Sequence, residues 1–224
     1  MTHAIAPFAK ILLVEAIDNS LVHLLYAVDY ARSRPDVVAI SMSWGGDERP
    51  EEANYDTHFT SSYGASFFVA SGDSGASAGP SYPAVSPNVI AVGGTNLVFN
   101  PDGSFSSETA WSGSGGGISQ YEPEPQYQLS YGVPNANGHR CNPDVSYNAG
   151  TGVSVYDSTP LDGETGWWSL GGTSAGAPQW AAIHSFNLTA NNNNFYQVAK
   201  GPVYPSYFRD IINGSNGYPA IVGL

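Results

Sequence analysis

The chain has 224 residues, which is long enough for one sizeable hydrophobic core and a single domain. Its formal net charge of -12 arises because Lys and Arg total only 7 against 19 Asp and Glu, a balance that argues against nucleic acid and anionic membranes as partners. A single cysteine excludes an internal disulfide. Because the chain has few cations, repulsion between them stays small when the carboxylates are protonated. The composition therefore suits a protein that works in acid.

Apolar runs alternate with helical patterns through the first half of the chain. Strands are predicted at residues 9–16, 37–43, 66–70 and 89–92, and helices between Ser20 and Pro35 and through Tyr55, Phe59 and Tyr63. Strands that are apolar throughout and alternate with helices predict a parallel sheet covered on both faces. Residues 96–166 are predicted to be irregular. Sites in such sheets lie at the carboxyl ends of the strands.

Two of these strand ends, and one later turn, carry polar chemistry. The second strand ends in Ser43-Trp44-Gly45-Gly46, and the third ends in Ser71-Gly72-Asp73-Ser74-Gly75. Further along, the turn Gly171-Gly172-Thr173 brings Ser174 to the first turn of a predicted helix. Backbone N–H groups and the positive end of the helix dipole favour an oxygen that becomes an anion there. On local chemistry alone, an ordinary helix N-terminus explains this serine equally well.

Several motifs in one order make the pattern specific. The Gly-Thr-Ser turn, the Ser-X-Gly-Gly strand end and the polar residue after Ala-Ser-Gly together resemble the subtilisin-like fold. Subtilisins place Asn where Asp73 stands, whereas Ser-Gly-Asp-Ser-Gly resembles the sedolisins, the serine-carboxyl peptidases. The further matches are Tyr82-Pro83-Ala84, Ser86-Pro87, Ala91-Val92-Gly93-Gly94-Thr95, Glu108 with Trp111, Gly115-Gly116-Gly117 with Ser119, and Pro143-Asp144-Val145-Ser146.

The resemblance implies an α/β, subtilisin-like three-layer fold with a mainly parallel central sheet flanked by helices, as one domain over residues 1–224. It implies an acid-active endopeptidase that works through an acyl-enzyme, with Ser174 as nucleophile. Histidine is a poor base in acid, because imidazolium outweighs imidazole by roughly 300-fold at about pH 4, whereas a carboxylate remains usable. Asp73, when protonated, would donate a hydrogen bond in the oxyanion hole. The implied substrate-binding residues are Ser43, Trp44 and Gly45 on one strand and Gly115, Gly116 and Gly117 on the facing strand.

The acids that activate the serine in sedolisins have no counterpart in this chain. The family's Glu and Asp lie four residues apart on a helix just before an Ala-Pro segment, which here is Ala6-Pro7. Both acids would therefore fall upstream of Met1, so the chain is expected to lack the first strand–helix unit and to be nearly inactive by itself. Glu52 and Asp56 have the same spacing but stand between the second and third strands. A solvated helix face is the expected role for them.

The sedolisin calcium site is also only partly present. Asp210 and the carbonyl of Ile211 match its first two ligands, but the second Asp of the site would follow the end of the chain. A calcium ion prefers six to eight oxygen ligands, so Ca²⁺ is expected to bind weakly or not at all. The resemblance further implies a secreted monomer, made with a propeptide, whose partners are protein or peptide substrates.

Two other classes of function remain open. The chain could be a non-catalytic relative that binds peptides in the same groove. It could instead be an extracellular adhesion or carbohydrate-binding module, which its content of Tyr, Trp and Asn would suit. The ordered peptidase motifs favour the peptidase interpretation over both.

Overall fold

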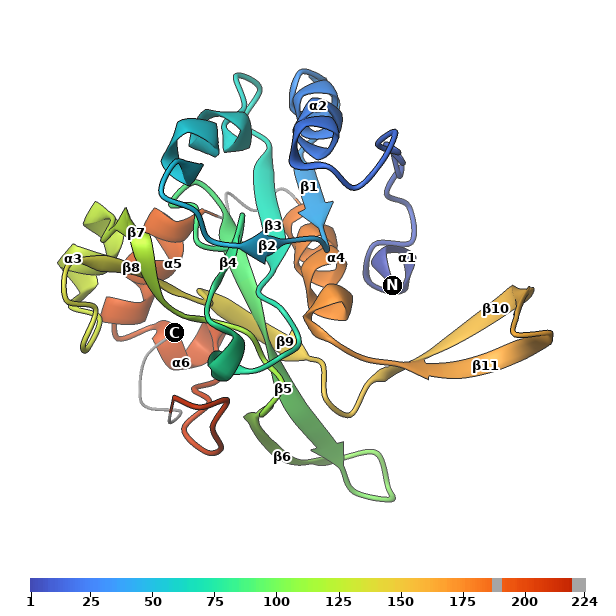
Figure 1. The fold of residues 1–224 in the computed structure, drawn as a ribbon. Coiled ribbons are helices and arrows are strands. Elements are labelled where there is room, and N and C mark those ends of the chain that lie inside the picture. Colours follow the sequence, from blue (N-terminus) through green and yellow to red (C-terminus); the bar gives the residue numbers. More distant parts are fainter. Residues whose placement is uncertain (187–190, 219–224) are drawn as a thin grey trace.

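The structure is a computed structural model that describes residues 1–186 and 191–218. Figure 1 shows the fold of the chain. The helices are α1 (Thr2–Ile5), α2 (Leu21–Arg32), η1 (Glu52–Phe59), η2 (Ala76–Ala78), α3 (Gln126–Tyr131), α4 (Thr173–His184), α5 (Asn192–Lys200) and α6 (Tyr204–Tyr207). The strands are β1 (Ala39–Met42), β2 (Gly46–Asp47), β3 (Ser66–Ala70), β4 (Ser81–Tyr82), β5 (Ile90–Phe99), β6 (Phe105–Ala110), β7 (Gly117–Pro123), β8 (His139–Asn142), β9 (Val145–Asn148), β10 (Val153–Leu161) and β11 (Glu164–Leu170).

The central sheet is mainly parallel, as the alternation of strands and helices predicts. β1 pairs with β3, β3 with β5, and β5 with β9, all in parallel, while β6 pairs antiparallel with β5. β5 pairs with three strands along its length: residues 90–92 pair with β3, residues 92–95 with β9, and residues 95–99 with β6. Because β1 and β3 are parallel, their carboxyl ends meet at one edge of the sheet.

Two hydrophobic cores cover the two faces of this sheet, and β3 contributes to both. Phe67 and Val69 belong to a cluster with Leu25 of α2, whereas Phe68 belongs to a second cluster with Ala177 of α4. Successive side chains of a strand point to opposite faces, so the continuous apolar run in β3 fills both cores. Each large side chain removed from water in this way contributes about 1.5–3 kcal/mol. The result is the predicted three-layer arrangement, with the sheet between α2 and α4.

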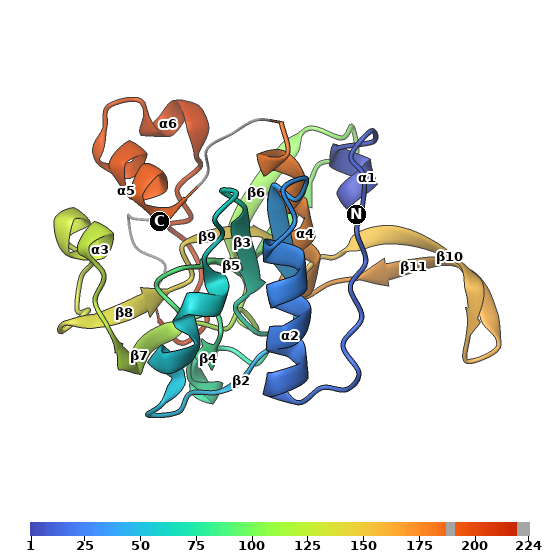
Figure 2. The same cartoon turned by 90° about the horizontal axis from the view of Figure 1, so that it is seen from above.

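The prediction of a buried strand at residues 9–16 is wrong. This segment contains no strand, and the side chains of Ile11 and Leu13 are 58% and 78% exposed. β1 stands at the edge of the sheet, so the apolar run has not paired with it. In Figure 2 the segment between α1 and α2 runs along the outside of the fold.

The prediction that residues 96–166 are irregular is also wrong. The region holds β6 to β10, the start of β11, and α3. β7 pairs with β8, and β10 with β11, as separate antiparallel two-stranded sheets. Their strands mix polar residues, Gly and Pro with apolar residues, because antiparallel strands need only one buried face. Figures 1 and 2 show the β10–β11 hairpin projecting from the body of the fold. No helix among the described residues is long and apolar enough to cross a membrane.

Candidate active site

The structure brings three predicted site segments together at one edge of the sheet. Ser43 follows β1, Asp73 follows β3, and Ser174 lies in the first turn of α4. The Ser43 hydroxyl donates to the Ser174 carbonyl oxygen at 3.3 Å, and the Thr173 backbone N–H donates to Asp73 Oδ1 at 2.7 Å. These contacts join residues that are a hundred or more positions apart in the chain.

Asp73 is held by the residue that precedes the serine. Its Oδ1 accepts from the Thr173 backbone N–H, and the Thr173 hydroxyl lies 2.9 Å from the same oxygen. The Thr173 hydroxyl in turn accepts from the backbone N–H of Gly72 at 3.1 Å. With Oδ1 occupied by donors, a proton on this exposed carboxyl group belongs on Oδ2. The site therefore separates an accepting oxygen from one that is free to donate.

Gly172 makes room for this carboxyl group. It is the N-cap of α4, with φ +93°, a conformation that residues with a side chain rarely adopt. A Cβ atom at this position would lie 2.6 Å from Asp73 Oδ2. The glycine in the Gly-Thr-Ser turn is therefore required both by the backbone and by the close approach of Asp73.

The backbone of Ser174 has a specific support. Pro178 lies four residues further along α4 and has no N–H, so it cannot donate to the Ser174 carbonyl in the usual helical pattern. The Ser43 hydroxyl takes that place. Among the described residues, none forms a hydrogen bond with the Ser174 hydroxyl. The serine is thus positioned through its backbone, while its half-buried side chain has no hydrogen-bond partner in the part of the chain that the structure describes.

Glu52 and Asp56 do not join this group. Glu52 is only 2% exposed, and its Oε2 accepts from the Arg49 backbone N–H at 2.7 Å. Asp56 is half-buried and accepts from the Tyr82 hydroxyl at 3.3 Å. The expectation of a solvated helix face is therefore wrong, because η1 turns both carboxyl groups inward toward β4 and β7. Sequence spacing could not reveal this packing.

The two predicted substrate-binding strands differ in exposure. Ser43 and Gly45 are exposed and Trp44 is half-buried, so one backbone edge is accessible. Gly115, Gly116 and Gly117 are all buried. A Cβ at Gly115 would lie 2.2 Å from the Ser71 carbonyl oxygen, and one at Gly116 would lie 2.5 Å from that of Asn142. Close backbone packing thus accounts for these two glycines, and their contact with substrate stays a prediction.

Of the predicted calcium site, the structure describes Asp210 and Ile211. Asp210 Oδ1 accepts a hydrogen bond from the Tyr204 hydroxyl at 2.6 Å, so part of its carboxylate is already engaged. No group of three or more His, Cys, Asp or Glu within residues 1–186 and 191–218 could hold a metal ion. Residues 219–224, which follow the matching Gly217-Tyr218 segment, lie outside the described residues. One carboxylate and one carbonyl do not meet the needs of calcium.

Gly172→Ala should lower stability by more than the strain of an alanine at a positive φ would alone. We expect the added methyl group to displace the Asp73 carboxyl group from its contact with Thr173, in addition to the strain of a positive φ. Gly103→Ala is the matched control, because Gly103 has φ +82° with nothing within 4 Å of the added Cβ. Urea unfolding measures the stability, and the ¹³C resonance of the Asp73 carboxyl reports its displacement. Equal losses, with an unmoved Asp73 resonance, would contradict the proposed crowding.

Comparisons with known proteins show the family of the chain. The model of the subtilase family matches residues 2–212. The chain is 32% identical over 220 residues to sedolisin from Pseudomonas sp. (strain 101), and 34% identical over 249 aligned positions to kumamolisin from Bacillus sp. (strain MN-32). These alignments cover 81% and 95% of this chain but only 35% and 43% of the two relatives. The chain therefore spans about two fifths of the length of these curated relatives.

Solved structures give the same family. Pseudomonas sedolisin, a serine-carboxyl proteinase complexed with two molecules of pseudo-iodotyrostatin, matches with a TM-score of 0.76 and 32% identity, over 93% of this chain and 64% of that one. Sphericase matches with a TM-score of 0.57 and 21% identity, over 90% and 61% of the two chains, which shows likeness of fold alone. By the family match and the sedolisin structure together, the chain belongs to the subtilase family, as a sedolisin-like member of it.

Proposed function

We propose that the chain carries the nucleophile and the oxyanion-binding group of an acid-active, serine-type endopeptidase. The observation that carries this proposal is the pair of Thr173 contacts to Asp73 Oδ1, which hold a carboxyl group beside the residue that precedes Ser174 in the chain. Similarity to sedolisin and kumamolisin supports the same assignment.

In this mechanism the Ser174 hydroxyl oxygen attacks the carbonyl carbon of a peptide bond, and its proton passes to a general base. The carbonyl oxygen becomes an oxyanion, to which a protonated Asp73 donates from Oδ2. The C–N bond then breaks, the leaving amine takes up a proton, and an ester of Ser174 remains. Water hydrolyses that ester and restores the serine. Ser174 has no base as a hydrogen-bond partner among the described residues, so this polypeptide by itself is expected to be nearly inactive.

Asp73 gives the proposal its dependence on acid. An ionised carboxylate would repel the oxyanion, whereas one hydrogen-bond donor at this position is worth about 2.7–4 kcal/mol. Activity is therefore expected to fall when the pH is high enough for Asp73 to lose its proton.

Substrate would bind as an extended strand. The accessible backbone of Ser43–Gly45 offers one edge for main-chain hydrogen bonds, and the Gly115–Gly117 segment is proposed to face it. Secretion, a propeptide, a monomeric state and calcium binding rest on the family resemblance.

A non-catalytic, peptide-binding role is the second candidate. The lack of a partner for the Ser174 hydroxyl among the described residues favours it. It predicts the same groove without a covalent bond to the serine.

Equilibrium binding of a peptide aldehyde tests both candidates without requiring turnover. An aldehyde forms a hemiacetal with a serine hydroxyl, and a missing base slows this step without changing its equilibrium. At pH 4 we expect the aldehyde to bind about a hundred-fold more tightly than the matching peptide alcohol, as analogues of a transition state do. Ser174→Ala should remove that difference and leave affinity for the alcohol unchanged. Calorimetry gives the affinities, and a ¹³C label on the aldehyde carbon identifies the hemiacetal.

Three results would separate the alternatives. Equal affinity for aldehyde and alcohol in the unsubstituted chain would favour the non-catalytic role. A preference for the aldehyde that survives Ser174→Ala would overturn the nucleophile assignment. If neither the aldehyde nor the alcohol binds, the proposed substrate groove is wrong. Binding of a glycan instead would favour an adhesion or carbohydrate-binding module.

A further inference from the structure

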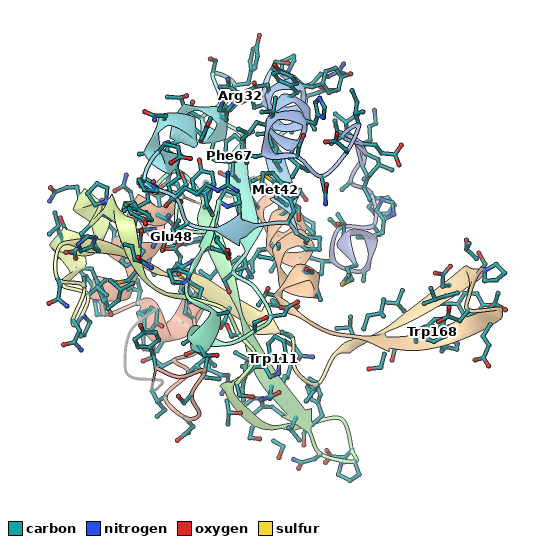
Figure 3. All side chains as sticks on the ribbon, in the orientation of Figure 1. Arg32, Met42, Glu48, Phe67, Trp111 and Trp168 are labelled. Atoms are coloured by element: carbon teal, nitrogen blue, oxygen red, sulfur yellow. The ribbon has the colours of Figure 1, made fainter. Side chains whose placement is uncertain are left out.

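Four carboxyl groups that the peptidase mechanism does not use meet at another place in the fold. Glu48 follows β2, Glu52 and Asp56 belong to η1, and Glu122 belongs to β7; these four are called the carboxyl clamp below. Glu52 and Glu122 are 2% and 1% exposed. Glu52 is close enough to be influenced by the carboxyl groups of Glu48 and Glu122, and Glu122 by those of Asp56 and Glu48. Figure 3 shows Glu48 near β2 and β7.

Two oxygens of the clamp are buried without a partner among the described residues, namely Oε1 of Glu52 and Oε1 of Glu122. Ionised carboxylates only accept hydrogen bonds, so two of them cannot satisfy each other. A proton shared within each contact supplies the missing donor. Burial of so many polar atoms is otherwise costly, because an unsatisfied buried group loses its hydration without compensation.

The groups around the clamp act in both directions, and burial has the larger effect. The hydroxyl of Tyr82 of β4 donates to Asp56, which by itself favours the ionised carboxylate. The cation that faces Glu122 is Arg140 of β8, whose guanidinium is already committed to Asp144 at 2.5 Å. Burial, followed by repulsion from neighbouring carboxylates, raises the pKa of Glu52 to about 8 and that of Glu122 to about 7. Burial likewise raises the pKa of Asp56.

The clamp joins the continuations of the two proposed substrate strands. Glu48 Oε2 accepts from the Gln120 backbone N–H at 3.2 Å, and Glu48 Oε1 accepts from the Ser119 hydroxyl. β2 continues directly from Ser43–Gly45, and β7 begins at Gly117. We propose that protons shared within the carboxyl clamp lock η1 and the segment after β2 onto β7 in acid, and that this lock loosens as the pH rises to neutrality. Its link to peptide binding rests on the proposed function, but the lock itself does not.

The direction of the pH dependence follows from linkage. Glu52 and Glu122 bind protons more tightly when folded, near pH 8 and pH 7, than an unfolded glutamate does near pH 4.3. The folded chain therefore holds more protons between about pH 5 and pH 7, and its stability falls as pH rises through this window. Each group increases the unfolding equilibrium constant by up to about tenfold per pH unit. Burial lowers the pKa of His184, which gives a slope of opposite sign, so variants must be compared with one another.

The experiment measures unfolding in urea from pH 4 to pH 8 without peptide. Unsubstituted protein should lose stability across this range. Glu52→Gln and Glu122→Gln keep the size of the side chain and supply a permanent donor, so each should reduce the slope by up to about tenfold per pH unit. Glu51→Gln is the matched control, because Glu51 is the exposed neighbour of Glu52 and should leave the slope unchanged. If a variant fails to fold, titration of the carboxyl ¹³C resonances of the unsubstituted protein gives the same answer.

Several outcomes would overturn the lock. One is a stability that stays level between pH 5 and pH 8 in both Glu51→Gln and unsubstituted protein. Another is an unaltered slope in Glu52→Gln and Glu122→Gln. A third is titration of the clamp carboxyl resonances near pH 4. Loss of the slope on adding millimolar Ca²⁺ would assign the clamp to a cation instead of protons. None of these measurements involves Ser174 or a peptide, so failure here is distinct from failure of the peptidase proposal.

Discussion

Peptide hydrolysis by this 224-residue polypeptide is expected to be about a million-fold slower than by a complete serine peptidase. In subtilisin, loss of the catalytic base alone removes about six powers of ten from kcat. Here the Ser174 hydroxyl has no hydrogen-bond partner among the described residues. Two of the histidines are engaged elsewhere, His23 with Asp18 and His58 with Asp29.

A small carboxylate should partly replace the missing base. At pH 4 and constant ionic strength, cleavage of a fluorogenic peptide should rise linearly with added formate or acetate. Ser174→Ala should abolish that response, and chloride at the same concentration is the control for salt. The measurement is the slope of the rate against carboxylate concentration.

The outcomes of this assay assign the parts of the site separately. Robust turnover without added carboxylate, lost in Ser174→Ala, would place a base within this chain. Turnover that survives Ser174→Ala would refute the nucleophile. A rate that depends on Ser174 but ignores carboxylate would show that something other than a base is limiting.

Arg140→Met should lower the free energy of unfolding by about 3–5 kcal/mol, the usual cost of removing one partner from a buried ion pair. Arg140 and Asp144 are both 0% exposed, and their atoms Nη2 and Oδ2 are 2.5 Å apart. Asp144 also accepts from the Ala91 backbone N–H at 2.8 Å and from the Tyr196 hydroxyl at 3.1 Å. It therefore ties β5, β8 and α5 together, and the substitution leaves its charge buried without a cation.

Urea unfolding at pH 7 measures this loss. Arg34→Met is the matched control, because Arg34 and Asp36 form an exposed pair at 3.2 Å, and exposed pairs contribute little to stability. The double variant Arg140→Met, Asp144→Leu removes the unpaired buried charge but leaves the Ala91 backbone N–H without its acceptor, so it should recover only part of the stability. A loss no larger than that of Arg34→Met would contradict the assigned role.

Much of the fold could be predicted from local pattern. The apolar runs at β1, β3 and the first part of β5 are confirmed as parallel strands, because strands buried on both faces carry an unbroken apolar signal. The signal failed at residues 9–16, where an equally apolar run forms no strand. Strand formation needs a partner as well as a pattern, and only the sheet topology shows which runs obtain one.

The sequence by itself determined the identities at the candidate site. Ser174, Asp73 and Ser43 were predicted because several motifs follow one another in the sedolisin order, whereas local pattern alone explained Ser174 equally well as an ordinary helix N-terminus. Tertiary structure alone decided which atoms meet: that Thr173 occupies one oxygen of Asp73, and that Ser43 supports the Ser174 carbonyl left without a donor by Pro178. It also turned Glu52 inward to the carboxyl clamp. Burial and long-range hydrogen bonds depend on contacts between distant segments, and such contacts leave no periodic trace in the sequence.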